Sequence, residues 1–345
     1  MAAPAAGWWR TQIMSRILLS HGAGGREMLR LIEEVFRSRY SPAGVSQDDS
    51  AVLSVDEASL ALTTDAFVVS PLFFPGGDIG RLAVAGTVND LLTAAAQPVA
   101  LAAAFILEEG FPLADLGRLV ASMQQTAAEA GVSIVTGDTK VVPRGSADQV
   151  FITTTGLGRI LRPGVSGAGA QPGDAVLLTG SVGDHGTAVM LARENLLGAA
   201  PIVSDAAPLT EIVLNLINAG VTVHALRDPT RGGLAATLNE IAVQSQTAIE
   251  IQEERVPVHP AVAAACEALG LDPLTVANEG KMVVIVPPTA ADQALDIIRK
   301  SRYGQEAAAI GTVLAGPAGR VQVRTAFGTA RLLEMPSGEL LPRIC

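Results

Sequence analysis

Short apolar segments separated by polar turns follow one another along the chain, with two different periods. Strict alternation in AVLSVD and SLALTTD predicts a hairpin within residues 51–64. Helical spacing predicts an amphipathic helix in REMLRLIEEVFRSRY, and apolar β-branched runs predict strands. In the first half we expect helices at 26–40, 78–97 and 113–130, and further strands at 99–107, 133–142 and 150–160.

A segment rich in glycine and proline, RPGVSGAGAQPG, separates this pattern from a second one. Beyond it we expect strands at 174–182, 221–226, 247–252 and 281–287, short strands to about 334, and helices at 184–194, 208–219, 230–244, 260–269 and 290–301. Each half is therefore predicted to be an α/β or α+β unit. The expected divisions are an N-terminal extension, glycine loop and helix (1–40), a first domain (41–161), a linker (162–173), a second domain (174–334) and a mobile tail (335–345).

The most apolar stretch, residues 82–107, does not predict a membrane helix. Asn89-Asp90 and Gln97-Pro98 interrupt it, whereas a span needs roughly 20 consecutive apolar residues. The opening MAAPAAGWWRTQIMSR lacks the apolar core of a signal peptide. We therefore expect a cytoplasmic protein without membrane contact.

Charge and cysteine content exclude several classes of protein. The net charge of -10 disfavours nucleic acid as a partner, because phosphate backbones call for clustered lysine and arginine. Two cysteines without a Cys/His cluster indicate neither a disulfide scaffold nor a zinc site. Cys266 lies in the helical run AVAAACEAL, where a core role explains it. Cys345 ends the Gly/Pro-containing tail PSGELLPRIC, where packing in a core does not explain the presence of a cysteine.

Acidic residues recur at predicted strand ends and turns of the first half. They are Asp48-Asp49 in QDDSAV, Asp65 in LTTDAF, Asn89-Asp90 in TVNDLL and Asp138 in VTGDTK. Carboxylates of this kind suit magnesium with bound phosphates, and any single one could equally cap a helix or turn. Asp90 is harder to explain as a cap, because an unpaired charge within an apolar helix is costly.

Two further motifs have both a chemical and a structural interpretation. SHGAGG, which includes Gly24 and Gly25, precedes a helix and could hold phosphates through backbone amides, although it lacks a Walker lysine. RDPTRGGL places Asp228 and Arg231 at a helix start, where Asp228 could simply be a cap. Glu279 in NEGKM could be an exposed turn residue or a base.

Taken together, QDDSAV, TTDAFVVSPLFFPGGDIGRLAVAGTVNDL, VTGDTKVV, RDPTRGGL, NEGKM and the terminal PRIC resemble the HypE family of hydrogenase maturation factors. That family belongs to the superfamily of aminoimidazole ribonucleotide synthetase (PurM-like) and selenophosphate synthetase. The resemblance implies a two-domain PurM-like α/β (α+β) fold. Its N-terminal domain would form a β-barrel core with a second copy, and its C-terminal domain would be an α/β sandwich with a flexible C-terminal tail.

The resemblance also implies a site and a reaction. ATP and Mg²⁺ would bind between the domains, with Asp48, Asp65, Asp90 and Asp138 at the metal and phosphate positions. Asn89, Gly24 and Gly25 would contribute to nucleotide binding. A carbamoyl group on Cys345 would be dehydrated to a thiocyanate, with Lys140 and Glu279 as the bases that deprotonate its nitrogen.

The implied partners are a second copy of the chain, the carbamoyltransferase HypF and a HypC–HypD complex that receives the cyanide on iron. Other enzymes of the superfamily are alternatives. Selenophosphate synthetase would need a reactive cysteine near the glycine loop, and residues 15–30 contain none. Thiamine-phosphate kinase and purine-pathway synthetases have no use for a terminal cysteine. A binding scaffold without turnover is the alternative outside enzymes, and an ATPase assay distinguishes it.

Overall fold

The computed structural model describes residues 17–37, 48–55, 58–196, 202–338, 341 and 343–345. The expected extension at the start of the chain lies largely outside these residues. The helix expected at 26–40 begins as α1 (Arg26–Leu31) and continues as a π-helical turn to Arg37. Its last expected residues also lie outside the described part.

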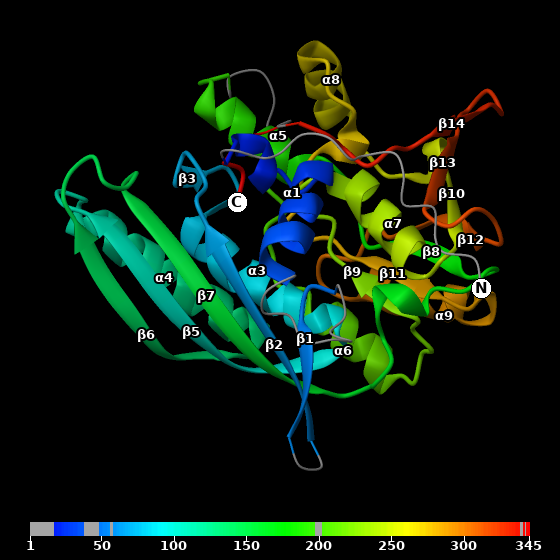
Figure 1. Cartoon of the computed structure of the whole chain (residues 1–345), viewed down its shortest axis with the longest axis horizontal. Coiled ribbons are helices and arrows are strands. Elements are labelled where there is room, and N and C mark those ends of the chain that lie inside the picture. The colour runs from blue at the N-terminus through cyan, green and yellow to red at the C-terminus, as the bar shows by residue number, and fades with distance from the viewer. Residues whose placement is uncertain (1–16, 38–47, 56–57, 197–201, 339–340, 342) are drawn as a thin grey trace.

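A five-stranded sheet in the order β1-β2-β7-β5-β6 forms the first half (Figure 1). Its strands are β1 (Ala51–Val55), β2 (Ala58–Phe67), β5 (Ala96–Glu108), β6 (Ser133–Val142) and β7 (Val150–Ile160). Neighbours run antiparallel except β5 and β6, which are parallel. The predicted hairpin and the strands at 133–142 and 150–160 are confirmed. The short pair β3 (Phe73–Phe74) and β4 (Gly77–Asp78) lies apart from this sheet.

The expected helix at 78–97 is shorter than predicted. As α3 it covers Ile79–Thr93, with the Asp78 carboxylate accepting from the Arg81 amide at its start. Ala95 then takes a positive φ of 52°, which an α-helix does not allow, and β5 begins at the next residue. The mostly apolar residues around this turn, LLTAAA at 91–96, give no change of period that would predict it.

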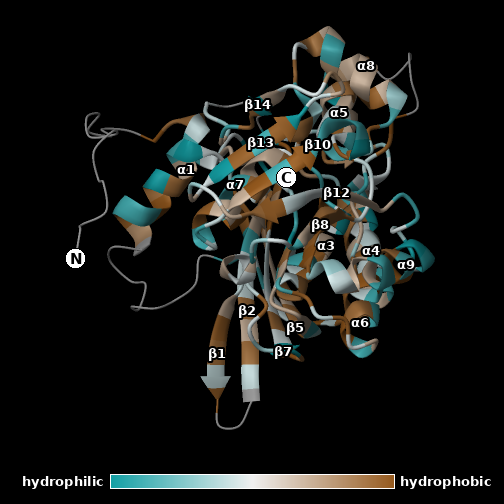
Figure 2. Cartoon of the chain, turned by 90° about the vertical axis from the view of Figure 1, so that its right-hand side faces the viewer, coloured by the Kyte–Doolittle hydropathy of each residue, from teal (hydrophilic) through white to brown (hydrophobic). Residues whose placement is uncertain are grey.

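Helices cover only one face of the five-stranded sheet. α3 packs on β2, β5 and β7, and α4 (Leu113–Ala130) packs on α3 and β6. In Figure 2 these helices lie together on one side of the strands. The opposite face carries exposed apolar side chains, and these include Leu62 and Ile106. β1 and β6 remain edge strands, so no barrel closes within the described chain.

A seven-stranded mixed sheet in the order β14-β13-β10-β12-β8-β11-β9 forms the second half. Its strands are β8 (Ala175–Leu178), β9 (Ala225–Arg227), β10 (Ala248–Gln252), β11 (Val283–Val286), β12 (Ala308–Leu314), β13 (Arg320–Arg324) and β14 (Ala330–Leu332). The helices are α5 (Asp184–Arg193), α6 (Thr210–Asn218), α7 (Gly233–Gln244), α8 (Pro260–Leu269) and α9 (Ala291–Lys300). The strand expected at 221–226 is reduced to β9, because only Ala225–Arg227 pair with β11.

Both faces of this second sheet are buried. Along β11, Val283 and Ile285 enter a cluster with α7, while Val284 and Val286 enter the cluster that holds α6 and α9. Alternate residues therefore serve two cores, which explains why the strand reads as a continuous apolar run. The second cluster also contains α3 and α4, so the halves share one core.

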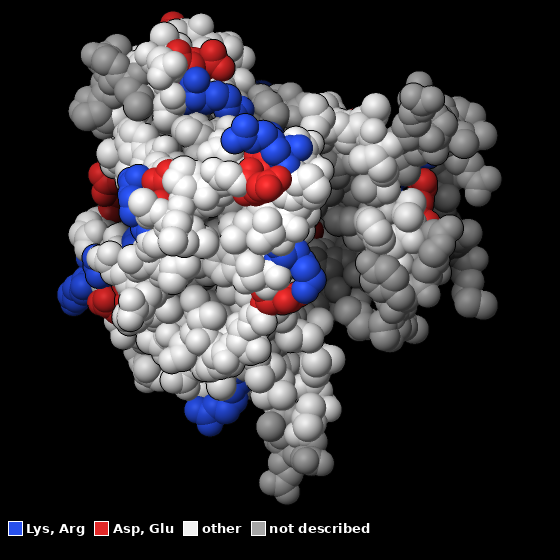
Figure 3. Space-filling view, turned by 90° about the vertical axis from the view of Figure 1, so that its left-hand side faces the viewer, with Lys and Arg blue, Asp and Glu red and all other residues white. Residues whose placement is uncertain are grey.

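On the face shown in Figure 3, blue side chains are scattered, most of them beside a red one, without a broad basic patch. Within the described part of the chain, no helix has the length and apolar character that crossing a membrane requires.

Candidate active site

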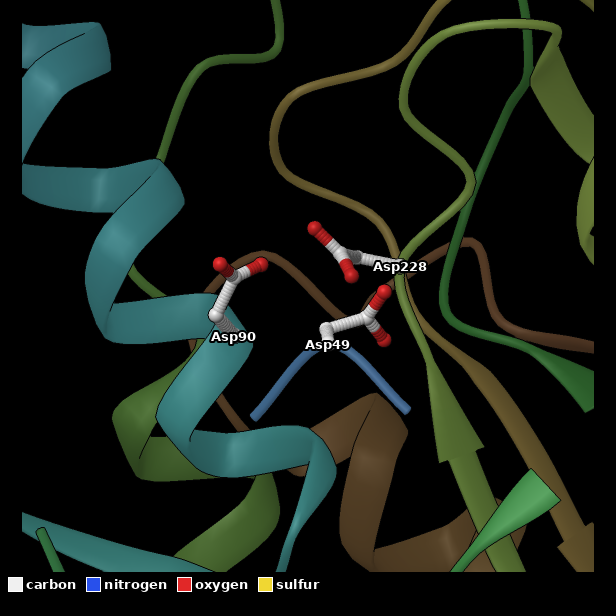
Figure 4. Close-up of side chains that lie close together, drawn as sticks. All are labelled: Asp49, Asp90 and Asp228. Atoms are coloured by element: carbon white, nitrogen blue, oxygen red, sulfur yellow. The ribbon is translucent and has the colours of Figure 1, made fainter. Parts of the chain in front are cut away.

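Three carboxylates from separate segments converge between the two halves. Asp49 precedes β1, Asp90 lies on α3, and Asp228 follows β9; one ligand oxygen from each lies within 4.8 Å of the others. Figure 4 shows the three side chains facing one another. Thr63 fixes the Asp90 carboxylate by donating from its hydroxyl at 2.8 Å. The chain thus brings together three oxygen ligands from residues far apart in sequence.

The electrostatics of this cluster favour a bound cation. Burial raises the pKa of Asp90 well above its ordinary value, and the charges of Asp228, Asp65 and Asp49 raise it further. Burial likewise raises the pKa of Asp228, and it raises that of Asp49 to about 6 although Arg227 opposes the shift. Carboxylates packed this closely repel one another unless a positive charge lies among them. Their oxygens are the donors that magnesium prefers, so these residues fit Mg²⁺.

Asp48, expected among the metal ligands, points away from this cluster. Its carboxylate accepts from the Gly167 amide at 2.9 Å and lies 3.5 Å from Arg227 Nη1. Asp49, its neighbour, faces Asp90 and Asp228 instead, with Arg227 Nε 3.1 Å away. The two neighbouring side chains therefore have different partners, and the sequence alone does not show which aspartate faces the site.

The C-terminal tail enters the molecule. The Val68 amide donates to the Cys345 carbonyl at 3.0 Å, and the Ser70 amide donates to the Arg343 carbonyl at 3.2 Å. His185 Nε2 lies 2.9 Å from the carbonyl of Ile344, which is 3% exposed. Figure 1 marks the C-terminus among β3, α1 and α5. The segment expected to be mobile is therefore seated in this structure through its main chain.

Cys345 lies beside Arg231, Glu279 and Asp65. Burial raises the pKa of its thiol, Arg231 opposes this shift, and the two carboxylates add to it. In turn, Cys345 is the largest cause of the raised pKa of Arg231, whose surroundings also include Asp65, Glu279 and Asp90. The thiol thus lies next to the acidic cluster, and Arg231 is the cation beside it.

Glu279 is a buried carboxyl near this thiol. It is 3% exposed, and its Oε1 has no hydrogen-bond partner among the described residues. Burial raises its pKa well above the ordinary value, and Asp65, Asp205 and Asp228 add to the shift. Of the two interpretations that the sequence left open, the structure excludes an exposed turn residue.

The glycine loop packs against other parts of the chain. Gly24 has a φ of +75°, and a Cβ there would lie 2.5 Å from Arg231 Cβ. A Cβ on Gly25 would lie 2.4 Å from the Pro336 carbonyl oxygen, at the start of the tail. Arg231 also donates to the Gly22 carbonyl at 2.8 Å. The loop thus joins the RDPTRGGL segment to the tail.

Asp138, Lys140 and Asn89 are not brought into the cluster. Asp138 and Lys140 lie on β6 at the far edge of the sheet, pair with each other at 2.7 Å and are more than half exposed. Asn89 is 1% exposed; its amide donates to the Ala207 carbonyl at 3.1 Å, and its oxygen accepts from Leu209. Within one chain, therefore, none of these three faces the acidic cluster.

Three residues of this region have no role in the site that the sequence assigns, namely Arg227, Asp228 and Arg231, and within the pair Asp48-Asp49 the resemblance selects Asp48 and not Asp49. The sequence allows a helix-cap role for Asp228, but this residue precedes α7 by several residues and its carboxylate faces that of Asp90. The sequence did contain a signal for a role in the site, since RDPTRGGL holds three charged residues and a helix cap requires only one.

Comparison with known proteins shows the family to which this chain belongs. Residues 47–160 match the N-terminal domain of AIR synthase related proteins, and residues 171–324 match their C-terminal domain. The carbamoyl dehydratase HypE of Rhizobium leguminosarum bv. viciae is 53% identical over 335 residues, which are 96% of this chain and 95% of that protein. The chain belongs to the HypE family.

Solved HypE structures superpose on the chain over most of its length. A HypE in complex with ATP has a TM-score of 0.82 at 49% identity, covering 96% of this chain and 100% of that one. The HypE of a HypE–HypF complex has a TM-score of 0.84 at 48% identity, covering 89% and 99%. These structures share the two-domain fold of the chain.

Proposed function

We propose that this chain is the ATP-dependent carbamoyl dehydratase that converts a carbamoyl group on Cys345 into a thiocyanate. This reaction supplies the cyanide ligands for iron during maturation of [NiFe]-hydrogenase. The supporting observation is the position of Cys345, whose thiol lies beside Arg231, Glu279 and Asp65. Comparison with the HypE carbamoyl dehydratases, one of them solved with ATP, supports the same activity.

The atoms of this reaction balance without a redox step. The carbamoyl group on sulfur is S–C(=O)–NH₂, and its oxygen leaves only after it becomes a good leaving group. ATP supplies a phosphoryl group to that oxygen, the C–O bond breaks to release phosphate, and two protons leave the nitrogen. The products are S–C≡N, ADP and phosphate, and sulfur remains bonded to the same carbon throughout.

Glu279 is placed to take a proton from the nitrogen. A carboxyl with a raised pKa accepts a proton more readily than an ordinary one. Its Oε1 has no partner in the described chain and its side chain is next to the thiol that carries the substrate. Arg231, on the same side, is the cation that would contact the oxygen as negative charge develops there.

Asp49, Asp90 and Asp228, with Asp65 close by, would hold Mg²⁺. When bound, the ion would neutralise the charge of the ATP phosphates. Gly24 and Gly25 remain candidates for contact with the phosphates, but only if the loop first separates from Arg231 and Pro336, since both glycines lie against them.

A homodimer would explain the exposed apolar face of the five-stranded sheet. Leu62 and Ile106 lie on it without a covering helix. Two such sheets packed face to face would bury these side chains and form a barrel. β6 and β2 lie toward opposite edges of one sheet. A two-fold axis would bring β6 of one copy, with Asp138 and Lys140, toward Asp65 of the other.

The proposed partners follow from the chemistry and from one relative. A HypE has been solved in complex with HypF, so the carbamoyltransferase HypF is the proposed donor to Cys345. A HypC–HypD complex is the proposed acceptor of the cyanide on its iron. A thiol on a terminal segment suits this exchange, because it can be presented to two partners in turn.

Intact-protein mass spectrometry tests the function. The chain is incubated with a HypF carbamoyltransferase and carbamoyl phosphate, and then with Mg-ATP. Addition of one carbamoyl group, followed by loss of one water from a modification mapped to Cys345, supports the proposal. A binding scaffold would show neither ATP consumption nor loss of water, and that outcome would overturn it.

A further inference from the structure

The peptide group of Glu279 is held from two sides while its carboxyl is not. On one side the Asp205 carboxylate accepts from the Glu279 amide at 3.1 Å and from the Gly280 amide at 3.3 Å. On the other, Asn89 donates to the Glu279 carbonyl at 3.4 Å. The first contact comes from the segment before α6 and the second from α3, so both halves of the molecule fix this peptide.

The packing around this peptide leaves little room for movement. A Cβ on Gly280 would lie 1.9 Å from the Asp205 carbonyl oxygen, so the two main chains touch directly. The Asp205 side chain is 4% exposed, and its carboxylate lies 3.6 Å from Lys281 Nζ. A buried carboxylate with two amide donors and a nearby ammonium is well satisfied and therefore fixed in direction.

At the other end of the same residue, Oε1 of the Glu279 carboxyl has no partner among the described residues. The carboxyl is buried against the Cys345 thiol, so its direction is set by the backbone that carries it and by the groups packed around it. A displacement of about 1 Å at a reacting group can lower a rate on the order of a hundredfold. What holds the Glu279 backbone therefore bears directly on the reaction.

We propose that Asp205 is a positioning residue, which aims the Glu279 carboxyl at the group on Cys345 by holding the amides of Glu279 and Gly280. The proposal rests on the proposed role of Glu279 as a base. Asp205 acts through the peptide it binds, and its charge also adds to the raised pKa of Glu279, a contribution that Asp205→Glu keeps.

A double-mutant cycle tests this in the full chain, carbamoylated on Cys345. Asp205→Asn, Glu279→Gln and the double variant are compared for the rate of water loss in a single turnover and for Mg-ATP affinity. We expect Asp205→Asn to slow dehydration on the order of ten- to a hundredfold, with Mg-ATP affinity unchanged. The double variant should be no slower than Glu279→Gln alone.

Asp184→Asn is the matched control. Asp184 is also a buried carboxylate near Lys281, at 4.0 Å from Nζ, but it bonds Ser181 and His259 instead of the Glu279 peptide. The Asp184→Asn variant should therefore dehydrate the carbamoyl group at the rate of the unaltered chain. Wild-type rate in Asp205→Asn, or a double variant slowed by the product of both single effects, would overturn the positioning role.

Two further outcomes are separable. A wild-type rate in Glu279→Gln removes the base role of Glu279, and with it both the proposed mechanism and this inference. A slow Glu279→Gln with a fast Asp205→Asn removes the inference alone. If Asp205→Asn fails to fold, Asp205→Glu keeps the charge beside Lys281 and has room in the adjoining cavity of about 590 Å³. It should slow dehydration as well, again without further loss in the Glu279→Gln background.

Discussion

The Val68 amide and the Cys345 carbonyl form a main-chain hydrogen bond of 3.0 Å, which ties the last residue of the chain to the end of β2. Asp65 lies three residues earlier on the same segment. The same strand therefore fixes how far the thiol reaches into the site and carries one of the carboxylates of the site. The terminus itself, and not only its cysteine, belongs to the geometry.

One added residue after Cys345 should therefore impair dehydration. The extra residue would have to occupy the space around the buried thiol or shift the whole tail along Val68 and Ser70. The rate of water loss in single turnover measures the effect. A residue inserted between Ser337 and Gly338 is the control, because both are exposed and the terminus stays unchanged. Equal rates in the two variants would contradict a defined depth.

Asp90→Asn should weaken Mg-ATP binding by roughly tenfold or more, because one of three charged ligands is lost. The fold should persist, since the neutral amide relieves a buried charge whose pKa is raised by its neighbours. Calorimetric titration with Mg-ATP and a thermal melt check the two parts. Asp48→Asn, whose residue bonds Gly167 outside the cluster, should bind Mg-ATP nearly as the unaltered chain does.

Magnesium should stabilise the chain more at higher pH. The pKa of Asp49 is raised from 3.8 to about 6, so between these values the folded metal-free chain binds more protons than the unfolded one. Its free energy of unfolding therefore falls as pH rises from about 4 to above 6. A cation among the carboxylates removes this loss and adds its own binding energy. Melting temperatures with Mg²⁺ or a chelator at about pH 5 and pH 7.5 measure the difference, and an equal gain at both would contradict it.

Local sequence patterns predicted most of the elements, because their periods reflect burial directly. α4, β6 and β7 begin and end at the expected residues. The boundary between α3 and β5 was misplaced because the residues on both sides of it are mostly apolar, and the positive φ of Ala95 separates the two elements. A period analysis has no signal for a turn made by an ordinary alanine.

The sequence indicated which types of residue form the site, but not every residue that lies in it. Asp65, Asp90, Glu279 and Cys345 do converge, yet Asp49 replaces Asp48 at the cluster. Arg227, which comes from the other half of the chain, lies near both Asp48 and Asp49, so the contacts that orient the two aspartates involve residues distant in sequence. Asp228 and Arg231 were visible in sequence, but their role required the approach of α3 to β9.

Lys140 should act on the site of a second copy. Lys140→Ala and Cys345→Ala should each be inactive as homodimers. Mixed dimers should regain up to half of the normal activity, because the intact cysteine of one copy meets the intact lysine of the other. Remixing of the purified variants followed by the dehydration assay measures this. Mixed dimers without activity would place Lys140 at its own site, and full activity in Lys140→Ala alone would remove it from the reaction.

Cys345→Ala should abolish thiocyanate formation while leaving Mg-ATP affinity nearly unchanged, and Cys266→Ala should do neither. The two thiols differ in what surrounds them. Cys266 is 1% exposed in an apolar cluster on α8, and burial raises its pKa, so it stays a protonated, inert thiol. Burial also raises the pKa of Cys345, but Arg231 lies beside that thiol and favours the thiolate.

The reactivity of the Cys345 thiol should therefore depend on Arg231. In Arg231→Met, carbamoylation of Cys345 should slow at neutral pH and recover as pH rises, because more of the thiol is then ionised. Mass mapping of the carbamoyl group over a pH series decides the matter. A group found on Cys266, or carbamoylation of Arg231→Met at the normal rate and pH dependence, would overturn this account of the thiol.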